Sequence, residues 1–234
     1  MKSLHQKKFR KEHGLFLIEG KKPVEEALQS TFKLHSLYSC DEAFLERFNQ
    51  GILVNSKDMA QISALNTPSD YLAVLHVPDM NSAQFQSTNQ ILLDGISDPG
   101  NMGTILRTAD WFGFNEIVCS EDTVELYNPK VVQSTMGSLF RVKVIYVDLS
   151  TYSKALVEKG YTIAGADLDG VNSFDYHFPE KTALVIGSES HGIRPNIESL
   201  LTQKVHIPGA GNAESLNAGI AAGILLSCWF KIKS

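Results

Sequence analysis

The sequence contains little cysteine and no closely spaced cysteine pair. Its three cysteines, Cys40, Cys119 and Cys228, are odd in number and far apart. This arrangement disfavours a disulfide framework, and it disfavours a zinc site, which usually brings its thiols in close pairs. We therefore expect free thiols, a reducing compartment and no bound metal.

Long apolar runs are also missing. No stretch of the chain reaches the roughly 18 apolar residues that a membrane-spanning helix needs. The start of the chain, MKSLHQKKFRKEHG, lacks the apolar centre of a secretory signal. These absences lead us to expect a cytoplasmic protein that does not act at a membrane.

Several common site motifs are absent. Neither the dinucleotide fingerprint Gly-x-Gly-x-x-Gly nor the P-loop occurs at the required position. The Gly-x-Ser-x-Gly elbow of serine hydrolases fails because Gly187 and Gly192 bracket Ser188 and Ser190 in the wrong register. Rossmann-type enzymes, P-loop NTPases and serine hydrolases are therefore disfavoured.

The chain as a whole lacks an excess of positive charge. Its formal net charge of -5 disfavours a protein that coats nucleic acid indiscriminately, since phosphate binding depends on Lys and Arg. Positive charge is instead concentrated near the N-terminus, where a solvated, partly frayed terminus and a local RNA contact are both open interpretations. The candidate RNA-binding residues in this part are Lys7, Lys8, Arg10, Lys21 and Lys22.

Strand and helix patterns alternate along the chain. Residues 15–77 predict a small α/β/α sandwich, and the polar residues 79–88 predict a linker. The expected domains are therefore 1–78 and 89–234. In the second domain the alternation favours a mainly parallel sheet with helices on both faces, so the fold class is α/β. We expect its strands near 91–94, 115–119, 143–147, 161–165, 182–187 and 203–207, and its helices near 102–112, 129–138, 151–158, 195–201 and from 214 onward.

The segment from Leu92 to Phe114 is the most informative part of the sequence. An apolar strand runs into Asp-Gly and Asp-Pro-Gly turn chemistry and then into a helix that begins near Asn101. Asn101 and Arg107 recur at helical spacing on this helix. Two interpretations stay open: a strand end that handles a ligand, or an Asn N-cap with Arg107 on a solvated face.

Two later segments repeat this pattern of an apolar strand that breaks into glycine and polar residues. The segment from Ala183 to Gly192 carries Glu189, and the segment from Val205 to Gly223 opens a small-residue helix bearing Ser215 and Asn217. Three such strand ends are hard to explain by packing alone. They favour the ligand-handling interpretation.

In order, spacing and context, these segments resemble the three motifs of the SpoU (TrmH) family of RNA ribose 2'-O-methyltransferases, within the knotted SPOUT superfamily. The likeness covers residue 89 to the C-terminus, and the run from Phe9 to Leu28 is similar to the start of the L30e-like substrate-binding domain often fused to this catalytic domain. The residues that carry the resemblance are Asn101-Met102-Gly103 with Arg107, Gly187-Ser188-Glu189, and Ser215-Leu216-Asn217.

The resemblance implies a trefoil knot in the second domain, in which the last third of the chain passes through a loop to make a cofactor pocket. It implies S-adenosyl-L-methionine as the cofactor. The residues that would bind this cofactor are Leu93, Gly187, Ile207 and Leu216, and the residues that would serve catalysis are Asn101, Arg107, Glu189, Ser215 and Asn217.

Three of these roles leave chemistry open. The family assigns activation of the ribose hydroxyl to the arginine at Arg107, but a guanidinium gives up its proton with difficulty. Glu189 is expected to pair with Arg107 or with the cationic end of the cofactor. His191 exchanges a proton more readily near neutral pH, although the family pattern gives it no role and a surface histidine is the simpler interpretation.

We therefore expect a two-domain enzyme that methylates a ribose 2'-oxygen of RNA as a homodimer. Its N-terminal domain favours ribosomal RNA over tRNA as the substrate. A tRNA enzyme and a noncatalytic RNA-binding or ribosome-assembly factor stay open as alternatives. The expected dimer surface is the terminal helix with Leu225, Leu226, Trp229 and Phe230.

Overall fold

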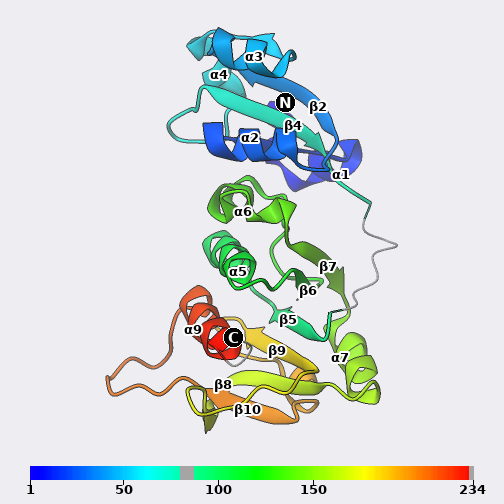
Figure 1. The fold of residues 1–234 in the computed structure, drawn as a ribbon, viewed down its shortest axis with the longest axis vertical. Coiled ribbons are helices and arrows are strands. Elements are labelled where there is room, and N and C mark those ends of the chain that lie inside the picture. The colour runs from blue at the N-terminus through cyan, green and yellow to red at the C-terminus, as the bar shows by residue number, and fades with distance from the viewer. Residues whose placement is uncertain (80–86, 232–234) are drawn as a thin grey trace. The chain divides into compact units, whose positions relative to one another are not determined.

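The computed structural model describes residues 1–79 and 87–231 (Figure 1). Contacts divide them into two compact units. Unit 1 contains residues 1–79 and 125–140, and unit 2 contains residues 87–124 and 141–231. Most of the linker expected at 79–88 lies outside the described residues. Within the described ranges, no helix has the length and apolar content that crossing a membrane requires.

Unit 1 is built on a four-stranded mixed sheet in the order β1-β4-β2-β3. β4 pairs antiparallel with β1 and β2, whereas β2 and β3 run parallel. This confirms the small α/β domain that the sequence predicts. Its strands are β1 (Leu15–Glu19), β2 (Leu34–Ser39), β3 (Ile52–Leu53) and β4 (Tyr71–His76), and its helices are η1 (Lys2–His5), α1 (Lys7–His13), α2 (Lys21–Gln29), α3 (Glu42–Phe48), α4 (Ser56–Ile62), α6 (Pro129–Thr135) and η2 (Ser138–Phe140).

Both faces of the unit 1 sheet are covered, because successive side chains of a strand point to opposite faces. On one face, Leu17 of β1 packs in a buried cluster with Leu4 and with Met59 of α4. The neighbouring Phe16 instead meets Tyr127, with 4.4 Å between the ring centroids. Residues 125–140, which the sequence analysis assigned to the second domain, thus contribute to the core of unit 1.

Arg10 ties the N-terminal helix to the same segment. Only 3% of Arg10 is exposed, and its guanidinium donates to the carbonyl oxygens of Leu4 and His5 at 2.9 Å each. It also donates to the carboxylate of Glu125 at 2.7 Å. The basic N-terminus is therefore folded into η1 and α1, which the sequence analysis did not foresee.

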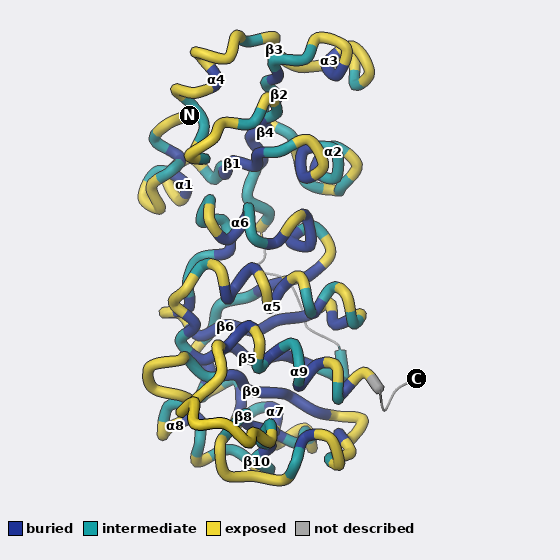
Figure 2. Tube along the Cα trace, turned by 90° about the vertical axis from the view of Figure 1, so that its left-hand side faces the viewer, coloured by how far each residue is buried: buried dark blue, intermediate teal, exposed yellow. Residues whose placement is uncertain are grey.

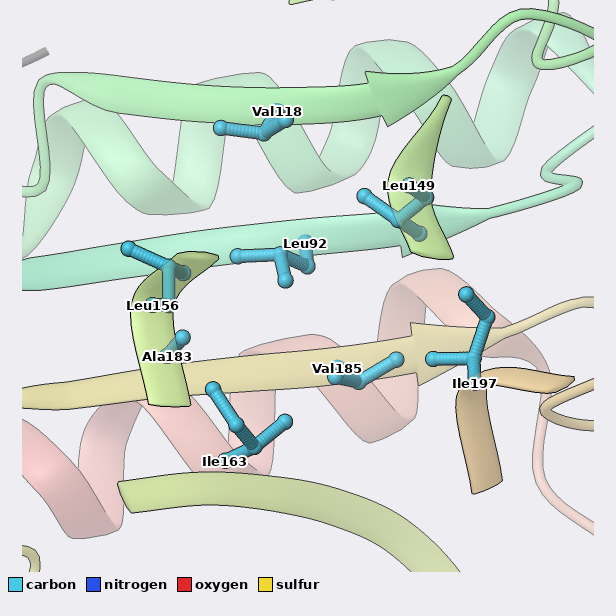
Figure 3. Close-up of a cluster of buried hydrophobic side chains, with 8 residues drawn as sticks. All are labelled: Leu92, Val118, Leu149, Leu156, Ile163, Ala183, Val185 and Ile197. Carbon is cyan, nitrogen blue, oxygen red and sulfur yellow. The ribbon is translucent and has the colours of Figure 1, made fainter. Parts of the chain in front are cut away.

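Unit 2 is a six-stranded, wholly parallel sheet in the order β10-β8-β9-β5-β6-β7. Helices lie on both of its faces, with α7 and α8 on one face and α5 and α9 on the other (Figures 1 and 3). The predicted parallel α/β architecture is confirmed. The elements are β5 (Asn89–Asp94), α5 (Pro99–Trp111), β6 (Glu116–Ser120), β7 (Lys143–Val147), α7 (Leu149–Glu158), β8 (Thr162–Asn172), β9 (Thr182–Gly187), α8 (Pro195–Glu198), β10 (Gln203–His206) and α9 (Ala218–Lys231).

A buried apolar cluster joins the central strands to α7 and α8, as Figure 3 shows. The strands β5, β6 and β9 are buried along most of their length (Figure 2). A strand that is covered on both faces has a continuous run of apolar residues. The sequence therefore predicted these three strands. The members of the cluster are Leu92, Val118, Leu149, Leu156, Ile163, Ala183, Val185 and Ile197.

Two element boundaries differ from expectation for identifiable reasons. β8 continues to Asn172 rather than ending near 165, because its polar second half pairs with β10 across a register shift at Lys204 and Val205. α5 begins at Pro99, because the carboxylate of Asp98 accepts the backbone N–H of Asn101 at 2.8 Å. Asn101 is therefore not the N-cap that one interpretation required.

The last helix begins later than expected. α9 begins at Ala218 rather than near 214, and the side chain of Asn217 accepts the backbone N–H groups of Gly219 and Ile220 at 3.0 and 3.2 Å. The small residues before Asn217 resemble a helix only in composition. The knotted chain path stays a prediction of the family resemblance.

Replacing Arg10 with Met is expected to lower the free energy of unfolding of unit 1 by roughly 3 kcal/mol, because the change leaves buried acceptors and Glu125 without their cation. The matched change Lys11→Met, on an exposed side chain of the same helix, is expected to cost less than about 0.5 kcal/mol. Hydrogen exchange of the β1 and β4 amides measures both values. Equal protection in the two variants would contradict this structural role.

Candidate functional site

The three glycine-interrupted segments meet at one edge of the unit 2 sheet. β9 lies between β5 and β8, and β8 pairs with β10, so the loops that follow β5, β9 and β10 leave neighbouring carboxyl ends. In open parallel sheets this edge is the usual place for a ligand. The convergence inferred from the sequence is therefore present.

A cavity of about 1020 Å³ opens at this edge. Its walls come from the middle of β8, the ends of β9 and β10, the loop 188–193, the segment 207–216 and the first half of α9. Its volume suits a ligand larger than a simple sugar or amino acid. Five of the residues selected from the sequence line it, namely Gly187, Glu189, Ile207, Ser215 and Leu216.

Leu93 does not line this cavity. Its side chain is completely buried in β5, the strand between β6 and β9. The corresponding wall comes instead from the middle of β8, at Ala166, Asp167 and Leu168. The sequence analysis missed this wall because it expected the strand to end near residue 165, whereas β8 continues to Asn172.

Glu189, Asn101 and Asn217 bring three separate segments together. The side-chain amide of Asn101, which is 6% exposed on α5, donates to the carboxylate of Glu189 in the loop after β9. The backbone N–H of Ala218 donates to the same oxygen at 3.4 Å. With Asn217 capping α9, the motif residues hold α5, the loop and α9 in one hydrogen-bonded network. Glu189 therefore pairs with Asn101 and not with Arg107.

The approach of α9 to this network is close. A Cβ placed on Gly219 would lie 3.2 Å from the side-chain oxygens of both Asn101 and Asn217. A larger residue at this position would therefore push the amide groups apart. The small-residue composition of the segment has a steric explanation here.

Arg107 lies six residues after Asn101 on α5, less than two helical turns away, and is exposed. Among the residues that the structure describes, none accepts a hydrogen bond from its guanidinium. Its neighbour one turn later, Trp111, is 84% exposed. Arg107 thus sits on a solvated face in the single chain, where the donors of its guanidinium are available for a ligand.

Ser215 and His191 occupy exposed positions on the cavity wall. Ser215 precedes α9 and does not cap it, so the capping role belongs to Asn217 alone. The imidazole Nδ1 of His191 lies 2.7 Å from the hydroxyl of Ser190. The structure thus places His191 at the cavity while giving it only a local partner.

The cavity is lined by carboxylates that one lysine partly neutralises. The lysine, Lys204 of β10, lies 2.6 Å from a carboxylate oxygen of Glu198 and 2.9 Å from one of Asp167. The hydrogen bond to Glu198, helped by Asp167, raises the pKa of Lys204. Two further acidic residues of the described wall, Glu189 and Glu214, form no ion pair with a described residue. The cavity therefore favours a ligand that carries positive charge.

The candidate RNA-binding residues all lie in unit 1 and fall into two groups. Lys7 and Lys8 on α1 and Lys21 and Lys22 on α2 are exposed. Arg10 is buried and paired, so the structure withdraws it from the candidate set. The ammonium of Lys21 also lies 5.4 Å from the ring centroid of Tyr71.

Comparison with known families gives two matches that together cover most of the chain. Residues 88–227 match the model of the SpoU rRNA Methylase family. Residues 1–73 match the model of the MRM3-like substrate binding domain. The first match contains all three glycine-interrupted segments.

Individual relatives agree with these matches. The 23S rRNA (guanosine(2553)-2'-O)-methyltransferase RlmP of Bacillus subtilis is 33% identical over 96% of this chain and 92% of its own length. The SpoU methyltransferase AviRb from Streptomyces viridochromogenes, solved in complex with AdoMet, superposes with a TM-score of 0.87 at 27% identity, over 99% of this chain and 96% of that one. The AdoMet-bound rRNA methyltransferase from Sinorhizobium meliloti superposes with a TM-score of 0.83 at 27% identity, over 97% of this chain and 91% of that one.

Proposed function

This chain belongs to the SpoU rRNA methylase family, and we propose that it transfers a methyl group from S-adenosylmethionine to a ribose 2'-hydroxyl of 23S ribosomal RNA. The observation that carries the proposal is the cavity at the strand ends, whose wall includes Gly187, Ile207 and Leu216 from the second and third motifs. The N-terminal match to a substrate-binding domain supports ribosomal RNA as the substrate.

The residues of the cavity fit the cofactor. Ile207 and Leu216 offer apolar surface for an adenosyl group, and Glu189 and Glu214 offer negative charge for its sulfonium and amino groups. Only glycine fits at position 187 of the wall, because a Cβ there would lie 2.1 Å from the carbonyl carbon of Gly192. When bound, S-adenosylmethionine supplies a methyl group on a positively charged sulfur.

The chain's own residues must hold the ribose and deal with the proton of its 2'-hydroxyl. We assign Arg107 to the substrate side, because its guanidinium is exposed, lies outside the cavity wall and belongs to the same helix as Asn101. A charged guanidinium orients a phosphate or polarises a hydroxyl without losing its proton. Asn101, Glu189 and Asn217 hold the loop and the two helices in place, and Ser215 offers a hydroxyl on the cavity wall.

Arg107→Ala is expected to lower kcat for methyl transfer to unmodified 23S rRNA by about 100-fold or more, as the loss of one preorganised donor does in other enzymes. The dissociation constant for S-adenosylmethionine should stay within twofold, because Arg107 is not part of the cavity wall. Labelled methyl transfer, read together with resistance of the product to alkaline cleavage at the modified nucleotide, measures the reaction.

The control for this experiment is Lys154→Ala, which removes an exposed cation from α7 on the other face of the sheet. This variant should transfer at the wild-type rate. Label on tRNA alone, label that leaves the ribose cleavable, or full activity in Arg107→Ala would contradict the proposal.

We further propose that the exposed lysines of unit 1 contact the RNA backbone. We expect two double variants, Lys7→Gln/Lys8→Gln and Lys21→Gln/Lys22→Gln, each to weaken RNA binding. In each variant the slope of the log association constant against log salt concentration should fall in magnitude by about 1.5, since each phosphate contact contributes about 0.7 to 0.9 to that slope. The matched control is Lys33→Gln/Lys57→Gln, two exposed lysines of the same unit. If all three double variants give one slope, the assignment of this surface is wrong.

We also propose that the chain forms a homodimer through α5 and α9. Of the four residues expected at the dimer surface, Leu225, Leu226 and Trp229 are at most 1% exposed and belong to the core of unit 2. Phe230 is 42% exposed, and its ring centroid lies 5.5 Å from that of Phe112 at the end of α5.

Two further exposed apolar side chains extend this surface. Trp111 of α5 is 84% exposed and Ile220 of α9 is 55% exposed. Large aromatic side chains left in water on packed helices are typical of a surface that a partner covers. A partner seated here would border Arg107, which lies one turn before Trp111.

Trp111→Glu and Ile220→Glu are expected to convert a dimer into a monomer, because a carboxylate would be placed in an apolar interface. Sedimentation velocity at micromolar concentration measures the mass. The control is Val157→Glu on α7, where the native side chain is 40% exposed on the opposite face of the sheet. A monomeric wild type, or a dimer that both α5 and α9 variants retain, would refute this interface.

A further inference from the structure

Asp94 is the last residue of β5, and its side chain is completely buried. Its register partner on the neighbouring strand is Gly187, the residue from which the motif loop after β9 departs. A buried carboxylate at a strand end requires compensation by a cation or by several N–H donors. Asp94 is not part of the cavity wall, so this compensation comes from the protein.

The compensation comes from Arg194, at the far end of the same loop. The backbone N–H of Arg194 donates to one carboxylate oxygen of Asp94 at 2.8 Å, and its Nε donates to the other at 2.7 Å. A second guanidinium nitrogen also bonds Asp94, and the third reaches Asp122 at 3.3 Å. These hydrogen bonds raise the pKa of the Arg194 guanidinium, so its charge is secure.

Asp94 is therefore linked to both ends of the loop: its backbone pairs in register with Gly187, and its carboxylate binds Arg194. The loop leaves β9 at Gly187, beside Asp94, and returns at Arg194, which binds Asp94 through its backbone and its side chain. Between these points Ser188 and Gly192 exchange backbone hydrogen bonds of 3.1 and 2.9 Å. The loop is thus folded back tightly on the end of its own strand.

Steric contact leaves this loop little room to move. A Cβ on Gly187 would overlap the backbone of Gly192, so strand end and loop are already in contact. Glu189 extends from the loop and bonds Asn101 of α5. A shift at Arg194 would therefore move both Gly187, on the cavity wall, and Glu189, in the motif network.

We propose that Arg194 and Asp94 are a positioning pair that fixes the loop 187–194, and through it the cofactor site, without touching the cofactor. The inference rests on the proposed function for the identity of the ligand. It assigns a role in binding to an ion pair between a buried carboxylate and a partly exposed guanidinium that lie 100 residues apart in the sequence.

The test uses the full chain and two substitutions at Arg194. Arg194→Met removes the cation, and Arg194→Lys keeps the charge but loses the planar fork. We expect the dissociation constant for S-adenosylmethionine, measured by calorimetry, to rise about tenfold in the Met variant and about threefold in the Lys variant. Displacements of about 1 Å at a binding group reach effects of this size.

A second readout needs no cofactor. In the unliganded Met variant, hydrogen exchange at the amides of Ser188 and Gly192 should accelerate at least tenfold, while exchange in the β5 and β9 cores stays unchanged. The matched control is Arg141→Met. Arg141 binds Asp110 in the same unit through Nε at 2.9 Å, away from the cavity wall. This control should leave both the cofactor affinity and the exchange of the loop unchanged.

The outcomes separate the two proposals. A wild type that does not bind S-adenosylmethionine refutes the proposed cofactor, while the exchange data still decide whether the pair fixes the loop. Wild-type affinity and wild-type loop exchange in Arg194→Met overturn the positioning role. Faster exchange throughout β5 and β9, with no recovery in Arg194→Lys, overturns it too, because the pair would then act on global stability alone.

Discussion

The pairing of β5 with β9 in the parallel sheet is the constraint on which the site depends. These strands are far apart in the sequence, yet their register sets Asp94 beside Gly187. Because parallel strands end at the same edge, this one pairing brings the first and second motifs together. β8 and β10 then extend the same edge and complete the cavity wall with the third motif.

The side chains at this edge divide the work between holding the fold and meeting a ligand. Three polar side chains form hydrogen bonds within the protein: Asn101 bonds Glu189, Asn217 caps α9, and Asp94 bonds Arg194. The guanidinium of Arg107 and the hydroxyl of Ser215 are instead exposed to solvent. A site of this kind presents a few free groups on a scaffold whose other polar residues are already satisfied, so little must be reordered when a ligand binds.

Local patterns were sufficient to find much of this architecture. Apolar runs predicted the strands of unit 2, and glycine-interrupted strand ends correctly placed Gly187 and Ile207 at a cavity. Leu93 does not line the cavity, because its side chain faces the core, and its role at the cofactor site stays a prediction. The Asp94–Arg194 and Arg10–Glu125 pairs depend on contacts across about 100 residues, for which one sequence contains no local signal.

The two units are interleaved along the chain, since residues 125–140 belong to unit 1. A fragment ending near residue 79 would lack two aromatic side chains of the core. Tyr127 packs against Phe16, and the ring centroid of Phe140 lies 5.0 Å from that of Phe32. It would also leave Arg10 without Glu125. During synthesis on the ribosome, unit 1 becomes complete only after β5, α5 and β6 of unit 2 have already emerged. A cut in the linker therefore yields an N-terminal piece with an unfinished core.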